Sequence, residues 1–477
     1  METKGAREMD IEGLEHPDKW AVETFGTTEL GDLRRTDRLV KMATAIAENP
    51  SASLPESMRN WADTLGAYRF LDNPEITHEQ IMEPHWMQTR EEAMRCSRVL
   101  LAADTTDINL SSHETAEGLG PIGRGNKAQG FFVHTVLAMD ADTQQLLGCM
   151  YQEPFVRQPA PKGETKAQRK KRVRESQIWE RSIQAIGPVP EEQQWIYVGD
   201  RGSDIYTFWQ ACQQLGYDFV VRVAQDRRVL LDEVPESEDP EVQRLKTLAR
   251  SLPAQGGRIL PVPAQRQRPA RDAFVQICWQ EVRIQPPVNG AVLSKTEVKV
   301  WVVRVWEPEP PDGREALEWI LVTTVPVLNE EDAWERVKWY KWRWLLEDFH
   351  KVLKTGCGIE VRRQQTVGAM WNLLGILTPM AMRLLWLRQT AQTAPDTPAT
   401  QVISQEVIYV ITKLDNRPGT TLTANDLWRT IASFGGYLNR KSDGPPGWQT
   451  LWKGWLYIQT ILQGVHLALR FPPSGFV

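Results

Sequence analysis

Over residues 18–85, apolar and polar positions recur with the period of an α-helix, and we assign 1–85 to an N-terminal helical domain. In the stretch RRTDRLVKMATAIAENP one predicted helix face is apolar, whereas Arg38 and Lys41 fall on another face. Arg69 adds a basic side chain in a later helical stretch. The pattern predicts a small helical domain with a basic edge, which either binds DNA or is a plain helical cap with solvated arginines.

From about residue 97 the apolar positions indicate strands. The runs RVLLAADTTD, GFFVHTVLAMD and QLLGCMYQEPF are separated by turn signals and predict a meander. A helical stretch, ESQIWERSIQAIG, follows them, and then come an apolar strand ending at Asp200, another helix, and the strand in YDFVVRV. This order predicts a mixed α/β sheet.

The alternation of helices and strands stops between about residues 226 and 328. Three β-rich stretches separated by Pro and Gly, DAFVQICWQEVRIQ, TEVKVWVVRVWEP and LEWILVTTVPV, predict an inserted antiparallel β subdomain. The α/β pattern then resumes, so we assign 86–388 to one domain that contains this insertion. A linker at 389–402 opens a helical C-terminal domain, 389–477.

The segment YKWRWLLEDFHKVLK, residues 340–354, predicts a single amphipathic helix. Its apolar face consists of Trp342, Leu345, Leu346, Phe349, Val352 and Leu353, and its opposite face of Tyr340, Arg343, Glu347, Lys351 and Lys354. A solvated charged face is the ordinary interpretation. However, one carboxylate among cations, flanked by Trp339 and Trp344, would also suit a helix along a phosphate backbone with one acid aimed at a metal ion or a proton.

Charge and cysteine usage limit the class of protein. The net charge of −5 over 477 residues argues against a uniformly basic nucleic-acid binder, although it allows local basic surfaces. The five cysteines are scattered without a CxxC motif, which predicts reduced thiols in a cytoplasmic protein without structural zinc. The polar N-terminal stretch METKGAREMDIEGLEH predicts no signal peptide.

One apolar run, VGAMWNLLGILTPMAMRLLWL, is long enough to resemble a membrane span. It contains Asn372, Pro379 and Arg383, and a charged side chain is costly in lipid. We therefore expect a buried helix interrupted at Pro379, and no association with a membrane.

Two aspartates follow apolar strands of the predicted sheet. Asp104 and Asp200 each end a predicted strand, and ligands gather at the carboxyl ends of neighbouring strands. Each aspartate alone is an ordinary turn or helix-cap residue. Glu347, on a helix packed against the sheet, would complete a set of three carboxylates. Oxygen ligands of this kind suit Mg²⁺ or Mn²⁺, and a pair of such ions supports phosphoryl transfer at a phosphodiester.

Several short motifs together carry a family resemblance. They are the signature Y-(2)-R-(3)-E-(6)-K formed by Tyr340, Arg343, Glu347 and Lys354, DTTD at 104–107, DRGSDI at 200–205, and WQTLWKGW at 448–455. In this order they resemble the cut-and-paste DDE transposases of the insertion-sequence-four group, over nearly the whole chain.

The resemblance implies a fold and a set of site residues. The fold would be a ribonuclease-H-like mixed-sheet core in which Asp104, Asp200 and Glu347 bind two Mg²⁺ or Mn²⁺ ions and catalyse the reaction. The residues matching DNA contacts of the family are Tyr340, Arg343 and Lys354 at transposon-end phosphates, Trp319 and Trp344 at a base flipped out during hairpin formation, Arg222 near the DNA, and Arg38 and Arg69 in the end-recognition domain. The C-terminal helices correspond to a dimerisation region.

The leading hypothesis is a DNA transposase that binds inverted-repeat ends and synapses them as a homodimer. It would cleave the DNA through a hairpin intermediate and transfer the strand into target DNA, each active site acting mainly on the end held by the other subunit. The alternatives are a ribonuclease-H-like endonuclease or resolvase without strand transfer, a non-catalytic DNA-binding inhibitor of transposition, and a large cytoplasmic α/β protein whose acids are helix caps.

Overall fold

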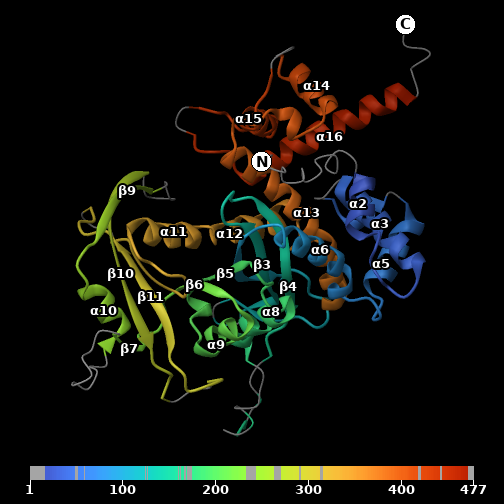
Figure 1. Ribbon diagram of the computed structural model, residues 1–477. Helices are drawn as coiled ribbons and strands as arrows, with labels where there is room; N and C mark the ends of the chain where they lie inside the picture. Colours follow the sequence, from blue (N-terminus) through green and yellow to red (C-terminus); the bar gives the residue numbers. More distant parts are fainter. Residues whose placement is uncertain are drawn as a thin grey trace, which may run out of the picture.

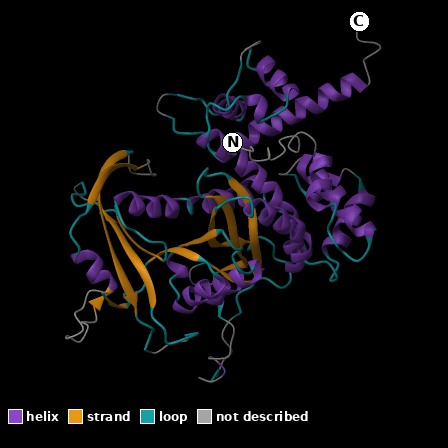
Figure 2. Ribbon diagram, viewed as in Figure 1, coloured by secondary structure: helices purple, strands orange, loops and turns teal. Residues whose placement is uncertain are grey.

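The computed structural model describes residues 17–470 except 49–51, 59, 124, 126, 159–160, 162, 166–167, 169–173, 232–242, 263–269, 289–291, 312–314, 417–420 and 441–442. Within these residues a large mixed sheet forms the middle of the molecule, and helices pack on both of its faces (Figures 1 and 2). Helical regions precede and follow the sheet in the chain. The predicted α/β class with helical N- and C-terminal regions is therefore confirmed, and the sheet is compatible with a ribonuclease-H-like core.

The sheet is continuous from the core into the predicted insertion. Its strands are β1 (Arg98–Asn109), β2 (Gly120–Ile122), β3 (Ala128–Asp140), β4 (Leu146–Phe155), β5 (Gln194–Gly199), β6 (Asp218–Arg222), β7 (Arg228–Leu230), β8 (Gln243–Arg244), β9 (Gly256–Val262), β10 (Arg271–Ile284), β11 (Val298–Trp306) and β12 (Glu318–Thr323). The path runs β2-β3-β1-β5-β6-β12-β11-β10-β7-β8, with β4 on β3 and β9 on β10. Strands β1, β5 and β6 are parallel. The inserted strands are antiparallel, as predicted, but β12 pairs directly with β6, so the insertion extends the core sheet.

The described helices fall into three groups. The N-terminal group is α2 (Pro17–Phe25), α3 (Leu33–Glu48), α4 (Leu54–Met58), α5 (Trp61–Leu71) and α6 (His78–Ala93); the sheet helices are α8 (Ile178–Ile186), α9 (Tyr206–Leu215), α10 (Leu245–Ser251), α11 (Glu330–Lys341) and α12 (Trp344–Lys351); and the C-terminal group is α13 (Val367–Thr393), α14 (Gln405–Leu414), α15 (Ala424–Phe434) and α16 (Trp448–Arg470). The apolar face predicted for the basic stretch is confirmed, since Leu39, Met42, Ala43 and Ile46 of α3 are buried. Helix α6 crosses residue 85 and packs against β4 and α13, so it is attached to the sheet as well as to the N-terminal helices.

The alternation of side chains along β1 divides the interior into two cores. Leu101 and Ala103 lie in a core that includes buried residues of α8 and α9. Leu100 and Ala102, which point to the other face, lie in a core shared with α11, α12, α13 and the terminal helical groups. Burial of both faces is typical of parallel strands that helices cover on each side. Because the side chains in the middle of such strands are buried, polar groups lie at the strand ends.

The segment 340–354 is not a single helix. Helix α11 ends at Lys341, and α12 begins at Trp344. At this break the N–H groups of Trp342 and Arg343 donate to carbonyls three residues earlier, at 3.1 and 3.2 Å, as in a 3₁₀ turn. Beyond α12 a π-helical turn, η4, covers Val352–Gly356. The predicted apolar face is nevertheless confirmed. Its members Leu345, Leu346, Phe349, Val352 and Leu353 are buried, and Trp342 is half-buried.

Two expectations for the following helix were wrong. Helix α13 continues through Pro379 instead of being interrupted there, and it extends to Thr393, so the predicted linker at 389–402 begins inside a helix. Helix α13 is buried in a large core, and this packing favours a continuous helix despite the hydrogen bond that Pro379 cannot make. In the described part of the chain, α13 is the one helix that is long and apolar enough to cross a membrane. However, 82% of its most apolar stretch is buried inside the protein.

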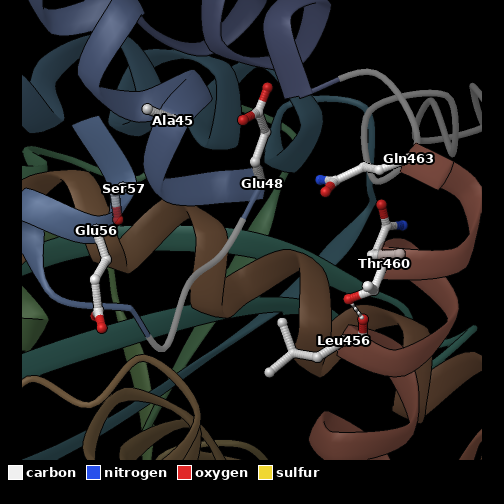
Figure 3. A pocket seen from close by; sticks show the side chains of 8 residues that line it. Ala45, Glu48, Glu56, Ser57, Leu456, Thr460 and Gln463 are labelled. Atoms are coloured by element: carbon white, nitrogen blue, oxygen red, sulfur yellow. Dashed lines mark hydrogen bonds between the residues drawn. The ribbon is translucent and has the colours of Figure 1, made fainter. Parts of the chain in front are cut away.

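The N-terminal and C-terminal helical groups face each other across a small pocket (Figure 3). Its lining residues are Ala45, Glu48, Glu56, Ser57, Leu456, Gln459, Thr460 and Gln463, from α3, α4 and α16. The lining is largely polar and contains none of the site residues predicted from the sequence, so this pocket is separate from the predicted chemistry.

Two glycines allow α15 and α16 to cross in backbone contact. A Cβ atom on Gly435 would lie 1.7 Å from the carbonyl oxygen of Thr450, and one on Gly454 would lie 1.7 Å from the carbonyl oxygen of Ile431. Both obstacles are backbone atoms, which cannot rotate away as a side chain can. Glycine is therefore required at both positions by the closeness of the helices.

We expect Gly454→Ala to lower the free energy of unfolding by roughly 1–3 kcal/mol, because the added methyl group must push two helices apart. Urea unfolding would measure this change. Gly464→Ala is the matched control in the same helix, since no atom lies within 4 Å of its Cβ position; it should stabilise by up to about 1 kcal/mol through helix propensity. Equal tolerance of both substitutions would contradict the close crossing.

Candidate active site

The register of the central strands brings the first two aspartates together. The parallel pairing of β1 with β5 ends at Ala103 opposite Gly199, so Asp104 and Asp200 are the next residues of adjacent strands. The expectation that Asp104 ends its strand was wrong, because β1 continues to Asn109 along its antiparallel partner β3. Asp200 directly follows the last residue of β5, as expected, and caps a short 3₁₀ helix, its carboxylate accepting the Gly202 N–H at 2.7 Å.

Arg343 joins the third carboxylate to the sheet. Its Nη1 atom donates to Asp104 Oδ2 at 2.8 Å, and its Nη2 atom donates to Glu347 Oε1 at 2.9 Å. The side chain of Arg343 is 14% exposed. The 3₁₀ turn between α11 and α12 positions this residue where it reaches the carboxylates of both β1 and α12. The guanidinium therefore acts as a cationic bridge between two of the three predicted catalytic acids.

The electrostatics of Asp104 reflect the convergence of all three acids. Burial is the largest cause that raises the pKa of Asp104, and the negative charges of Asp200 and Glu347 raise it further. Arg343 and the N–H of Thr105 oppose this change, and the net pKa of Asp104 is about 6. The pKa of Arg343 is itself raised, since its carboxylate neighbours outweigh the effect of its burial. The negative charges of the three acids lie close together here, and the positive charge of Arg343 partly offsets their repulsion.

The donor set of this site fits a hard divalent cation. Carboxylate oxygens without nitrogen or sulfur ligands select Mg²⁺ or Mn²⁺. In the described part of the chain, no group of three or more His, Cys, Asp or Glu side chains is gathered tightly enough to hold a metal ion as it stands. The bridge explains the spacing, because Asp104 and Glu347 are arranged around a guanidinium, which is larger than a metal ion.

The aromatic residues predicted to contact DNA are divided between buried and open positions. Tyr340 is only 3% exposed, so its assignment to the open polar face was wrong; its ring packs edge-on against Trp319, with centroids 5.6 Å apart. Arg222 donates to the carbonyl of Glu318 at 3.3 Å, beside Trp319. Trp344 is 53% exposed. The structure thus brings Tyr340, Trp319 and Arg222 together where the insertion joins the core.

The basic residues predicted to contact DNA lie in two places. Lys354, in the π-helical turn, donates to Asp107 at 3.3 Å and lies 3.9 Å from Glu360. Arg38 pairs with Asp63 at 2.9 Å, which connects α3 to α5, and Arg69 is exposed on α5. Helices α3 and α5 lie beside α6, away from β9 and α11 (Figure 1). Arg38 is thus paired within the N-terminal helices and does not contact Asp104, Asp200 or Glu347, which together we call the carboxylate site.

One supporting pair was missed from the sequence. Asp204, the second acid of DRGSDI, is fully buried, accepts the N–H groups of Ala224 and Gln225 at 2.7 Å each, and pairs with Arg227 at 2.6 Å. It connects the turn that begins at Asp200 to the segment after β6. The only sequence signal for Asp204 is its place four residues after Asp200 in DRGSDI. That signal does not identify the partner Arg227, which lies more than twenty residues further along the chain.

Two comparisons with known families concern the regions that flank this site. Residues 17–76 match the transposase DNA-binding family, and residues 379–475 match the transposase Tn5 dimerisation domain. These matches support a Tn5-like transposase. The first covers α2 to α5, the helical region predicted to bind DNA, and the second covers the end of α13 with α14 to α16. A transposase of this kind binds DNA and forms a homodimer, and the carboxylate site lies between its two matched regions.

The raised pKa of Asp104 predicts a pH-dependent stability. Between the ordinary pKa of 3.8 and about 6, the folded state keeps a proton that the unfolded chain has released, so wild-type stability should fall as the pH rises through this range. Asp104→Asn removes the charge and should therefore be more stable than wild type at pH 7, by at most roughly 3 kcal/mol, but not at pH 4. Urea unfolding in the presence of a chelator would measure both values.

The control for this prediction is Asp63→Asn. Hydrogen bonds from Lys41, Asn60 and Arg38 hold the pKa of Asp63 well below its usual range. Its replacement should therefore lower stability at pH 7, the opposite sign. A variant Asp104→Asn that is less stable than wild type at pH 7 would contradict the proposed burial of this charge.

Proposed function

We propose that this protein is a DDE transposase of the insertion-sequence-four group that cuts and rejoins DNA with Asp104, Asp200 and Glu347. In this proposal it acts in the cytoplasm, binds inverted-repeat ends, pairs them as a homodimer, cleaves them through a hairpin intermediate and joins them to target DNA. The observation that carries the proposal is the bridge of Arg343 between Asp104 and Glu347, with Asp200 beside Asp104 in the sheet.

The three carboxylates would hold two Mg²⁺ or Mn²⁺ ions. When bound, such ions activate a water molecule or a 3′-hydroxyl group and stabilise the leaving oxygen of a phosphodiester. The protein supplies the geometry. Adjacent parallel strands hold Asp104 beside Asp200, and Arg343 connects Glu347 of α12 to Asp104. The buried pair of Asp204 and Arg227 supports the turn at Asp200 from behind.

Arg343 would have two successive partners. A guanidinium donates in a fork that suits a carboxylate and a phosphate equally well. Arg343 neutralises Asp104 and Glu347 in this structure, and its N–H groups would be available to a phosphate of the transposon end once divalent ions neutralised the carboxylates. Lys354, at the far end of the same segment, would contact the next phosphates, and its present partner Asp107 keeps it oriented until then.

The aromatic residues would hold the DNA end while it is cut. Trp319 packs on Tyr340 at the junction of insertion and core, and Trp344 presents more than half of its surface next to Arg343. Stacking of a flipped-out base on such rings stabilises an unpaired nucleotide near the scissile bond. Arg222 holds the strand on which Trp319 lies.

We expect Asp200→Asn and Glu347→Gln each to lower DNA cleavage by roughly 10³-fold or more, because each removes a carboxylate from the reacting centre. The substrate is a duplex with the inverted repeat that flanks the coding sequence, incubated with Mg²⁺ or Mn²⁺, and gel electrophoresis would resolve the hairpin product. Binding of the end, measured by gel shift, should be unchanged.

Asp142→Asn is the control. Asp142 pairs with Arg98 at a part of the sheet away from the site, so this variant should cleave DNA at the wild-type rate. Normal cutting by Asp200→Asn would refute the triad. Cutting of unpaired ends without a joined product would instead indicate a nuclease or resolvase, and binding without any cutting by wild type would indicate an inhibitor.

We also expect Arg343→Gln to lower the cleavage rate by about 10²-fold, since a neutral amide cannot stabilise phosphate charge. Loss of the cation should raise the pKa of Asp104 further, because Arg343 is the largest influence that lowers it. The pH at which cleavage is half-maximal should therefore move upward, and Arg343→Lys should restore part of the shift. An unchanged pH profile would contradict the bridge.

A further inference from the structure

Asp348 follows Glu347 in α12 but faces the C-terminal helices. Its Oδ1 atom lies 2.8 Å from Nη1 of Arg388, an ion pair with α13. The same oxygen accepts a hydrogen bond from the indole Nε1 of Trp448, the first residue of α16, at 3.4 Å. The Arg388 guanidinium also lies 4.8 Å from the ring centroid of Trp448. We call these three residues the Asp348 link.

The Asp348 link joins two regions that have different roles. Arg388 and Trp448 both fall within residues 379–475, which match the dimerisation domain. Asp348 lies on the helix of Glu347. The contact is not confined to these side chains, because α13 packs against α12 and η4, and α16 packs against η4. The region matching the dimerisation domain therefore rests directly on the segment that runs from Glu347 to Lys354.

Helix α12 is held by charged groups on two sides. On one side Arg343 connects Glu347 to Asp104 in the sheet. On the other side Arg388 and Trp448 hold Asp348. The side chains of Asp348 and Arg388 are 25% and 17% exposed, so their attraction is screened less than that of a surface pair. A short helix between a 3₁₀ turn and a π-helical turn has weak internal restraint at both ends, so its orientation depends on the burial of its apolar face and on these charged contacts.

We propose that Asp348, Arg388 and Trp448 are positioning residues through which the dimerisation region places Glu347 against Asp104 and Asp200. This inference rests on the proposed function, since it concerns the third carboxylate of that site. These contacts hold α12 where Glu347 reaches Arg343, which in turn contacts Asp104. Loss of the Asp348 link loosens α12 and misplaces Glu347, so cleavage slows although the DNA end is still bound.

The experiment compares Arg388→Gln, Arg388→Lys and Trp448→Phe in the full-length protein. Single-turnover cleavage is measured with Mg²⁺ on a duplex carrying the inverted repeat that flanks the coding sequence, beside end affinity by gel shift and dimer fraction by sedimentation. We expect Arg388→Gln to reduce the cleavage rate constant by about tenfold or more, with affinity and dimer fraction within about twofold of wild type. Arg388→Lys should recover most of the rate because it keeps the charge opposite Asp348. Trp448→Phe, which keeps an aromatic ring but removes the indole donor, should show a smaller loss.

Amide hydrogen exchange provides a second measurement that needs no catalysis. Residues 344–351 should exchange faster in Arg388→Gln than in wild type, and at the wild-type rate in Arg388→Lys. The matched control is Arg440→Gln, which breaks an ion pair with Asp443 in the same C-terminal region, at 3.2 Å. This control should change neither the exchange of α12 nor the cleavage rate.

The outcomes are separable. Wild-type exchange in α12 together with wild-type cleavage by Arg388→Gln would overturn the inference. A loss of cleavage that merely follows an equal loss of dimers would overturn it as well, because the residues would then serve assembly alone. If the wild-type protein cuts no DNA, the proposed function fails, and the exchange of residues 344–351 by itself decides whether the Asp348 link holds this helix.

Discussion

The arrangement of the three acids depends on the attraction between one guanidinium and two carboxylates at a partly buried edge of the sheet. Asp104 and Glu347 carry the same charge and lie with Asp200 in a partly buried position, which would separate them without a cation. Arg343 supplies that cation and is held by the turn between α11 and α12. The break between α11 and α12 is therefore part of the site. Arg343 lies in this break, directly before α12, and from there it reaches both Asp104 on β1 and Glu347 on α12.

The surrounding architecture supplies restraints from different directions. Parallel pairing of β1 with β5 fixes Asp104 beside Asp200, and the pairing of β12 with β6 attaches the insertion, with Trp319, to the same sheet. Helix α13 passes through the core and continues into the C-terminal region, where Arg388 contacts Asp348. The regions that match DNA-binding and dimerisation families thus share one hydrophobic core with the strand and helices that carry Asp104 and Glu347.

Local patterns predicted much of this arrangement, and the errors have identifiable causes. The apolar face of segment 340–354 was predicted correctly, because burial of these side chains follows helical spacing in α12 and its flanking turns alike. Tyr340 was misplaced because the packing of Trp319, from a strand close to twenty residues earlier, decides its burial. The end of β1 was misplaced because its partner β3 continues after β5 has stopped. Pro379 does not interrupt α13, because the helix is buried along most of its length in the core that the sheet and the terminal helices share.

By itself the sequence determined the order of helical and sheet regions, the apolar faces of the helices, and the identity of the three acids as candidates, because hydrophobic periodicity and short motifs are local properties. The tertiary structure alone decided which charges meet. The bridge of Arg343 to Asp104 spans 239 positions of the chain, the contact of Trp448 with Asp348 spans 100, and the pair of Asp204 with Arg227 spans 23. Such contacts depend on strand register and helix packing, for which the energies are distributed over the whole core and are not encoded in any one segment.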